Sequence, residues 1–148
     1  MKFGYLIDMD GVIYRGSEVI PGAPEFIRHL QSENIPYLFL TNNSAYTRRD
    51  VVVKLRKWDI ETSVDHVYTS ALATAEFVHK QKPKGTAFVI GEGGLLNALS
   101  EVDYAISRDN PDYVIVGEGR VLNFEMAEQA HRCIANGAHL ISTNADTW

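Results

Sequence analysis

The chain has 148 residues, of which 45% are hydrophobic and 22% charged. These values are typical of a globular protein with a hydrophobic core, and the length allows one ordinary domain or two small units. The formal net charge of −5 argues against nucleic acid or an anionic membrane as a partner. There is no apolar run long enough to cross a bilayer and no recognisable signal peptide, so we expect a cytoplasmic protein.

The first expected strand ends in two aspartates. An apolar run at residues 5–7 leads into Asp8 and Asp10, and Gly11 follows at once. Because alternate residues of a strand point to the same side, the two carboxylates, with Cα atoms about 6.7 Å apart, can address one group. A bound Mg²⁺ would relieve their mutual repulsion, and an aspartate can attack phosphorus as a nucleophile. A Ca²⁺ loop and a strand end capped by polar residues are the alternatives.

Strand and helix patterns then alternate along the chain. The periodicity predicts a small hairpin, a helix, a strand, a helix, a short strand and a helix, over residues 12–20, 23–32, 36–40, 47–58, 66–69 and 71–80. The first helix is expected to bury Phe26, Ile27 and Leu30 on one face, and the run at 36–40 suits a strand buried on both faces. This alternation predicts an α/β fold with an open parallel sheet.

A polar segment, Thr41 to Ser44, follows the second of these strands. Ligands of open parallel sheets bind beyond the carboxyl ends of the strands. If the two strands are neighbours, Asp8 and Thr41 therefore share one crevice, in which the Thr41 hydroxyl and the Asn42 N–H bind phosphate. For Asn43 and Ser44 we expect instead a polar turn that leads into the next helix.

Residues 82–85, Lys-Pro-Lys-Gly, interrupt the pattern and are the best candidate for a domain boundary. Beyond them, an apolar strand with a Gly-Glu-Gly turn at 89–97 recurs at 115–123, which argues for a second α/β layer. Leu96 and Leu122 stand where a dinucleotide-binding fingerprint needs its last glycine. We therefore interpret the glycines as tight turns between strand and helix.

The last expected elements are a helix over 123–136 and a strand over 139–142. Cys133 is interpreted as a small core residue of this helix. The periodicity predicts that the helix also buries Phe124, Ala127, Ala130 and Ile134.

The motif Asp8-Met9-Asp10-Gly11-Val12, followed by Thr41-Asn42-Asn43-Ser44, resembles the motifs of haloacid dehalogenase superfamily phosphatases. The short hairpin, the Gly-Glu-Gly strands and the Thr-Asn-x-Asp end resemble the NagD-like branch, which includes 4-nitrophenylphosphatase-type enzymes. The resemblance implies a parallel-sheet, Rossmann-like core with an inserted α/β cap. It assigns residues 1–84 to the N-terminal part of the core and residues 85–148 to the first part of the cap.

The resemblance also implies Mg²⁺-dependent hydrolysis of small organic phosphate monoesters through an aspartyl-phosphate. Asp8 matches the family's nucleophile and Asp10 its general acid/base. The resemblance also implies that both residues hold Mg²⁺, Asp10 usually through its backbone carbonyl. Thr41 and Asn42 match its phosphate-binding motif. Asp146 lies where it could contact the substrate, and a turn residue after a strand is an equal alternative.

Two parts of the family's site have no counterpart in this sequence: a lysine that steadies the nucleophile and phosphate, and a later acidic motif that completes the Mg²⁺ site. Both normally follow the cap. Lys54 and Lys57 lie within an expected helix, and the lysines of 80–84 lie at a helix end and a linker, so none matches. We therefore expect the N-terminal part of a longer protein, inactive or weakly active alone.

The expected partner is a small phosphorylated metabolite, and a homo-oligomer is left open. The alternative is a non-catalytic α/β module that binds phosphate or a partner protein.

Overall fold

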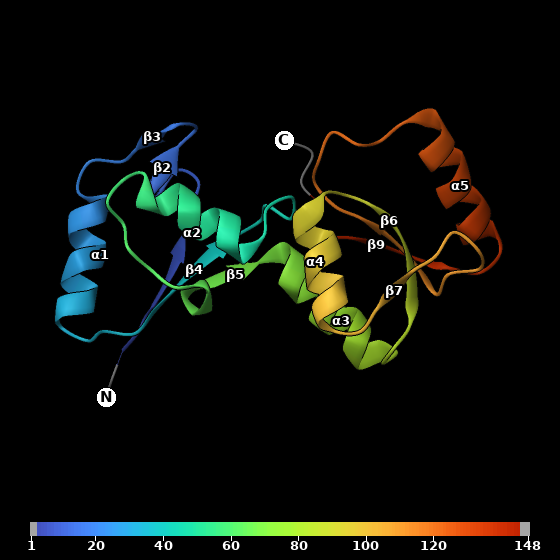
Figure 1. The fold of residues 1–148 in the computed structure, drawn as a ribbon, viewed down its shortest axis with the longest axis horizontal. Helices are drawn as coiled ribbons and strands as arrows, with labels where there is room; N and C mark the ends of the chain where they lie inside the picture. Colours follow the sequence, from blue (N-terminus) through green and yellow to red (C-terminus); the bar gives the residue numbers. More distant parts are fainter. Residues whose placement is uncertain (1–2, 146–148) are drawn as a thin grey trace. The chain divides into compact units, whose positions relative to one another are not determined.

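The structure of the chain is a computed structural model, and it describes residues 3–145 (Figure 1). Its contacts divide the chain into two compact units. The first unit contains the chain up to Thr41 together with Arg48–Thr69, and the second contains Asn42–Thr47 together with the chain from Ser70. None of the helices within residues 3–145 combines the length and the apolar character that crossing a membrane requires.

The first unit is built on a parallel sheet in the order β1-β4-β5, which confirms the predicted α/β alternation. Its elements are β1 (Tyr5–Asp8), β2 (Tyr14–Arg15), β3 (Glu18–Val19), α1 (Ala23–Ser32), β4 (Tyr37–Thr41), α2 (Arg48–Arg56), the 3-10 helix η1 (Val64–His66) and β5 (Val67–Thr69). Strands β2 and β3 form the expected antiparallel hairpin.

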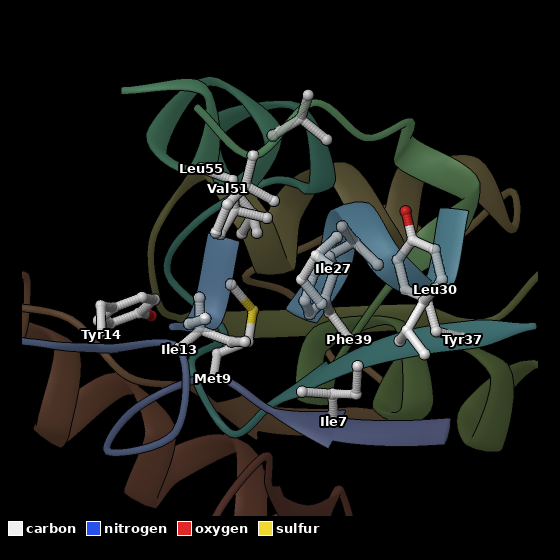
Figure 2. Close-up of a cluster of buried hydrophobic side chains, with 14 residues drawn as sticks. Ile7, Met9, Ile13, Tyr14, Ile27, Leu30, Tyr37, Phe39, Val51 and Leu55 are labelled. Atoms are coloured by element: carbon white, nitrogen blue, oxygen red, sulfur yellow. The ribbon is translucent and has the colours of Figure 1, made fainter. Parts of the chain in front are cut away.

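One face of this sheet carries the core of the first unit. Ile7 and Phe39 project from neighbouring strands and pack with Ile27 and Leu30 of α1 and with Leu55 of α2 (Figure 2). These side chains are almost fully buried, and each contributes on the order of 1.5–3 kcal/mol relative to an exposed position.

The other face of the same sheet is open within the described part of the first unit. Leu6 is 73% exposed, and Leu38 and Leu40 are only half-buried. The expectation that residues 36–40 are buried on both faces is therefore wrong here, because α1 and α2 cover the same face. Phe26 was also expected inside, but it is 39% exposed and meets the ring of Tyr5 edge-on at 5.4 Å.

The second unit contains a four-stranded parallel sheet in the order β7-β6-β8-β9. Its elements are α3 (Ser70–Gln81), β6 (Thr86–Ile90), α4 (Gly93–Glu101), β7 (Ala105–Ile106), β8 (Tyr113–Val116), α5 (Phe124–Ala135) and β9 (His139–Ser142). Ala87 and Val89 pack with α3 and α4, whereas Phe88 and Ile90 pack with α5. Helices on both faces explain why β6 reads as a continuous apolar run.

The internal repeat corresponds to the pairing of β6 with β8. Val89 lies opposite Ile115 and Ile90 opposite Val116, which is the alignment that the sequence repeat predicts. The repeat ends with the strands, however, because α4 begins directly at Gly93, whereas α5 begins only at Phe124.

Helix α5 buries a different stripe from the predicted one. Ala130 and Cys133 are buried as expected, but Phe124 is 86% exposed and Ile134 is 37% exposed. Ala127, also expected inside, is exposed. Ala130 and Cys133 pack with Phe88, Ile90 and Val114 of the sheet, and this packing determines which side of α5 faces inward. On the same side, Gln129 Nε2 donates to the carbonyl of Arg108 at 2.8 Å.

The boundary predicted at residues 82–85 does not coincide with the boundary between the packed units. Helix α3 precedes this segment, yet it packs with α4 in the second unit. The buried Tyr104 hydroxyl holds the segment, since its one proton is shared between the carbonyls of Val78 at 2.9 Å and Lys82 at 2.6 Å. Burial raises the pKa of Tyr104 to about 12. The division into packed units does not test the assignment of residues 1–84 to a core and 85–148 to a cap. That assignment stays a prediction.

Asp112, directly before β8, binds Lys82 of the same segment and Thr86 at the start of β6. Its Oδ1 lies 2.5 Å from Lys82 Nζ, and its Oδ2 accepts from the backbone N–H of Thr86 at 2.8 Å. These hydrogen bonds lower the pKa of the Asp112 carboxyl below its ordinary value of 3.8, with the bond from Lys82 as the largest cause. A carboxyl whose pKa is lowered by folding stabilises the folded state at pH values above its ordinary pKa. This contribution is lost as the pH falls through the folded-state pKa.

We therefore expect Asp112→Asn to reduce the free energy of unfolding by about 1–2 kcal/mol at neutral pH. The difference from the wild type should shrink as the pH is lowered below the ordinary carboxyl pKa, where the wild-type side chain also loses its charge. Urea denaturation at neutral and acidic pH measures this, with Asp109→Asn as the exposed control. An equal loss at both pH values would contradict the electrostatic origin.

Candidate active site

The ends of β1 and β4 bring two of the predicted site residues to one edge of a sheet. The strands are parallel, and Asp8 lies opposite Leu40, so Thr41 is one residue beyond it on the neighbouring strand. Adjacent strands run about 4.8 Å apart. The structure thus places Asp8 and Thr41 on adjacent strands at the same carboxyl edge of the sheet, as the sequence predicts. That their side chains meet at one phosphate stays a prediction.

Asp8 and Asp10 follow the alternation of a strand. Ile7 and Met9 are 6% and 1% exposed and lie in the core, whereas both aspartates are exposed. Asp8 Oδ1 accepts from the N–H of Met9 at 2.8 Å, which fixes the orientation of this carboxylate.

A tight turn follows the aspartates and leads to the hairpin. Gly11 has φ +82°, a left-handed conformation that favours glycine. Its N–H donates to the carbonyl of Tyr14 at 2.7 Å, and the carbonyl of Met9 accepts from the N–H groups of Ile13 and Tyr14 at 2.9 and 3.2 Å. The backbone on both sides of Asp10 is therefore held by hydrogen bonds to residue 14.

The polar segment after β4 passes from the first unit to the second at the bond between Thr41 and Asn42. The carbonyl of Asn42 accepts from Ser70 Oγ at 2.5 Å. Asn43 forms the expected turn, since its Oδ1 accepts from the N–H groups of Ala45 and Tyr46 at 2.9 and 3.2 Å. The phosphate-binding roles of Thr41 and Asn42 stay predictions.

Ser44 differs from the expected turn residue, because it is completely buried in the second unit. Its Oγ accepts from the N–H of Glu118 at 2.8 Å and lies 3.0 Å from Thr143 Oγ1. It therefore joins the polar segment to the residues that follow β8 and β9. Sequence reasoning missed this role because the partners lie 74 and 99 residues away along the chain.

Two glycines of the repeat leave room for this segment. A Cβ on Gly94 would lie 2.6 Å from the carbonyl oxygen of Ser44 and even closer to that of Tyr46. A Cβ on Gly117 would lie 2.9 Å from Ser44 Oγ. Gly94 of α4 and Gly117 of the second Gly-Glu-Gly motif thus permit the close approach of the segment after Thr41.

Lys54 of α2 is a charged residue near the site that the motif analysis set aside. Burial lowers the pKa of its ammonium from the ordinary value, while the negative charge of Asp10 acts in the opposite direction and Lys57 adds to the lowering. The sequence offered one signal, because Lys54 and Trp58 are four residues apart on one face of the helix expected over 47–58, although α2 itself ends at Arg56.

The oxygen ligands at the strand ends meet the needs of a hard divalent cation such as Mg²⁺ only in part. Asp8 and Asp10 offer carboxylate oxygens on one side of the chain, and Mg²⁺ is commonly held by one or two carboxylates with waters and substrate phosphate. Within residues 3–145, however, no three His, Cys, Asp or Glu side chains gather closely enough to hold a metal ion. Asp146, the predicted substrate contact, lies outside the described residues.

A family model described as haloacid dehalogenase-like hydrolase matches residues 5–105. The chain is 40% identical to a dihydroxyacetone phosphatase of Corynebacterium glutamicum, over 99% of this chain and 53% of that protein. It is 42% identical to the 5'-nucleotidase YutF of Bacillus subtilis, over 97% of this chain and 56% of that protein. The solved structure of NagD from E. coli K-12 superposes with a TM-score of 0.90 at 37% identity, over 97% of this chain and 57% of that one.

The chain therefore belongs to the haloacid dehalogenase-like hydrolase family, and its likeness to NagD confirms the expected branch. The parallel α/β architecture is confirmed as well. The chain spans only about half the length of the curated relatives it matches.

The fit between α4 and the polar segment predicts opposite outcomes for adjacent glycines. Gly94→Ala should lower the free energy of unfolding by about 2–4 kcal/mol, because backbone carbonyls must move to admit the methyl group. Gly93→Ala is the matched control, since its Cβ would meet nothing within 4 Å, and it should be neutral or mildly stabilising. Urea denaturation of both variants measures the difference, and equal stabilities would contradict the packing.

Proposed function

We propose that the protein carrying this chain hydrolyses small organic phosphate monoesters with Mg²⁺, through a phosphorylated Asp8. The observation that supports the proposal is the parallel pairing that brings Asp8 and Thr41 to the same edge of the sheet, at the carboxyl ends of β1 and β4. Family membership supports it, as do the phosphatase and nucleotidase names of the relatives.

In the first step, an Asp8 carboxylate oxygen attacks phosphorus and the bond to the ester oxygen breaks. Because Oδ1 is engaged with the N–H of Met9, we assign the attack to Oδ2. Asp10, on the same side of the strand, gives its proton to the leaving alcohol. Thr41 and the N–H of Asn42 hold the phosphoryl oxygens during the transfer.

In the second step, water attacks the phosphorus of the aspartyl-phosphate. Asp10, now ionised, accepts a proton from this water, and the acyl phosphate bond breaks to release inorganic phosphate and restore the Asp8 carboxylate. The Asp8 carboxylate and the backbone carbonyl of Asp10 would hold Mg²⁺, which would supply positive charge that offsets the phosphoryl oxygens and the nucleophile.

The proposed substrate class is a small phosphorylated metabolite. The two curated relatives act, by name, on a triose phosphate and on nucleotides, so the shared chemistry is the phosphate monoester and not one leaving group. We propose that residues 1–84 belong to the core that performs the chemistry, and that residues 85–148 belong to the cap, which would contact the leaving group with Asp146 as a candidate.

Asp8→Asn tests the proposed nucleophile in the protein as its gene encodes it. We expect hydrolysis of p-nitrophenyl phosphate to fall by at least about a thousandfold, because an amide cannot form the aspartyl-phosphate. Binding of inorganic phosphate, followed by calorimetry, should persist. The matched control is Asp103→Asn, an exposed turn position with φ 59° that asparagine also adopts, and it should retain activity.

Turnover that survives Asp8→Asn would refute the nucleophile. If the wild type binds phosphate but hydrolyses no monoester, the alternative of a non-catalytic phosphate-binding module is correct.

A second prediction concerns residues 1–148 on their own. We expect this chain to hydrolyse p-nitrophenyl phosphate weakly or not at all, because two carboxylates facing a phosphate dianion need more positive charge than the described residues supply. Comparing residues 1–148 with a product extended to the length of its relatives checks this. Full turnover by residues 1–148 alone would show that this chain contains a complete site.

A further inference from the structure

Lys54 lies against two aromatic rings beside the turn that follows Asp10. Its Nζ is 3.5 Å from the centroid of the Tyr14 ring and 5.7 Å from that of Trp58. The centroids of the two rings are 5.2 Å apart, and their planes are inclined by 31°. Because a ring face attracts a cation, this arrangement holds the end of a long flexible side chain in one place.

The contact with Tyr14 reaches Asp10 through the backbone. Residues 10 and 14 form an isolated β-bridge, and the N–H of Gly11 donates to the carbonyl of Tyr14 at 2.7 Å. The N–H of Tyr14 in turn donates to the carbonyl of Met9 at 3.2 Å. Tyr14 itself is only 8% exposed and is anchored in the core shown in Figure 2. A force that fixes Tyr14 therefore fixes the chain on both sides of Asp10.

The charge of Lys54 also interacts with the charge of Asp10. Its side chain is half-buried, and Asp10 is the negative group that favours the charged ammonium. Lys57, in the turn directly after α2, is exposed. The two lysines thus differ in a way that the sequence motif does not reveal: Lys54 faces the turn after Asp10 and Lys57 faces solvent.

We propose that Lys54 is a positioning residue, whose ammonium, held by the rings of Tyr14 and Trp58, fixes the turn after Asp10 and so holds the Asp10 carboxylate toward the reacting group. The inference rests on the proposed function and adds a residue to it. Lys54 acts through Tyr14 and Asp10 and does not contact the substrate. It is therefore distinct from the lysine that the family resemblance expects later in the chain.

The test measures kcat and KM for p-nitrophenyl phosphate in the protein as its gene encodes it. Lys54→Met keeps the aliphatic stem and removes the charge, and we expect kcat to fall about five- to twentyfold, the range that a partly buried cation–π contact is worth. KM should stay within about twofold of the wild-type value, because the phosphate-binding residues are untouched. Lys54→Arg should restore most of kcat, since a guanidinium also stacks on an aromatic ring.

The matched control is Lys57→Met, an identical substitution at an exposed position just after the end of α2, and it should leave both constants unchanged. Tyr14→Leu should lower kcat as Lys54→Met does, and the double variant should be no worse than either single one, because the two side chains act as one unit. Thermal melting identifies a variant that fails to fold. If Lys54→Met fails to fold, the comparison of Lys54→Gln with Lys54→Arg takes its place.

Wild-type kcat in folded Lys54→Met, or failure of Lys54→Arg to restore kcat, would overturn the inference. So would additive losses in the double variant. Asp8→Asn separates this result from failure of the proposed function. If Asp8→Asn abolishes turnover and Lys54→Met does not lower it, only the role of Lys54 is wrong.

Discussion

The parallel pairing of β1 with β4 is the constraint on which the candidate site depends. It fixes Asp8 opposite Leu40 and so brings Thr41 to the same edge of the sheet. A parallel ladder cannot slip by one residue without turning Ile7 and Phe39 out of the core, where they are 6% and 0% exposed. Burial on one face of the strands therefore determines which polar groups meet at their ends.

The second structural theme is the division of the polar segment after β4. Thr41 ends a strand of the first unit, and the next six residues are built into the second. Ser44 is fixed there by the residues that follow β8 and β9, and Gly94 and Gly117 provide the space. The Gly-Glu-Gly turns contain no nucleotide fingerprint. The space that Gly117 leaves for Ser44 is a structural reason for a glycine there, besides the turn itself. The segment that supplies a proposed phosphate-binding amide, Asn42, is thereby part of the second unit's hydrogen-bond network.

Much of the fold follows from the sequence, since apolar runs and helical periodicity located the parallel strands and gave α1 its observed bounds, Ala23–Ser32. The errors arose where tertiary contacts decide. Phe26 and Phe124 have the right periodicity for burial, but no neighbouring surface in their units covers them fully. The position of Asp8 and Thr41 at one edge of the sheet could be predicted because parallel strands align their ends. The approach of Lys54 to Tyr14 could not, because it depends on how α2 is rotated against the hairpin.

The central claim is that Asp8 carries the phosphoryl group, and its most direct test is to look for that group. Rapid acid quench during turnover, followed by mass spectrometry of peptides, locates any covalent phosphate in the protein as its gene encodes it. The account predicts one phosphoryl group on the peptide that contains Asp8, at the Asp8 side chain. Phosphate on a different residue, or none on the protein while substrate is consumed in the same samples, would contradict it.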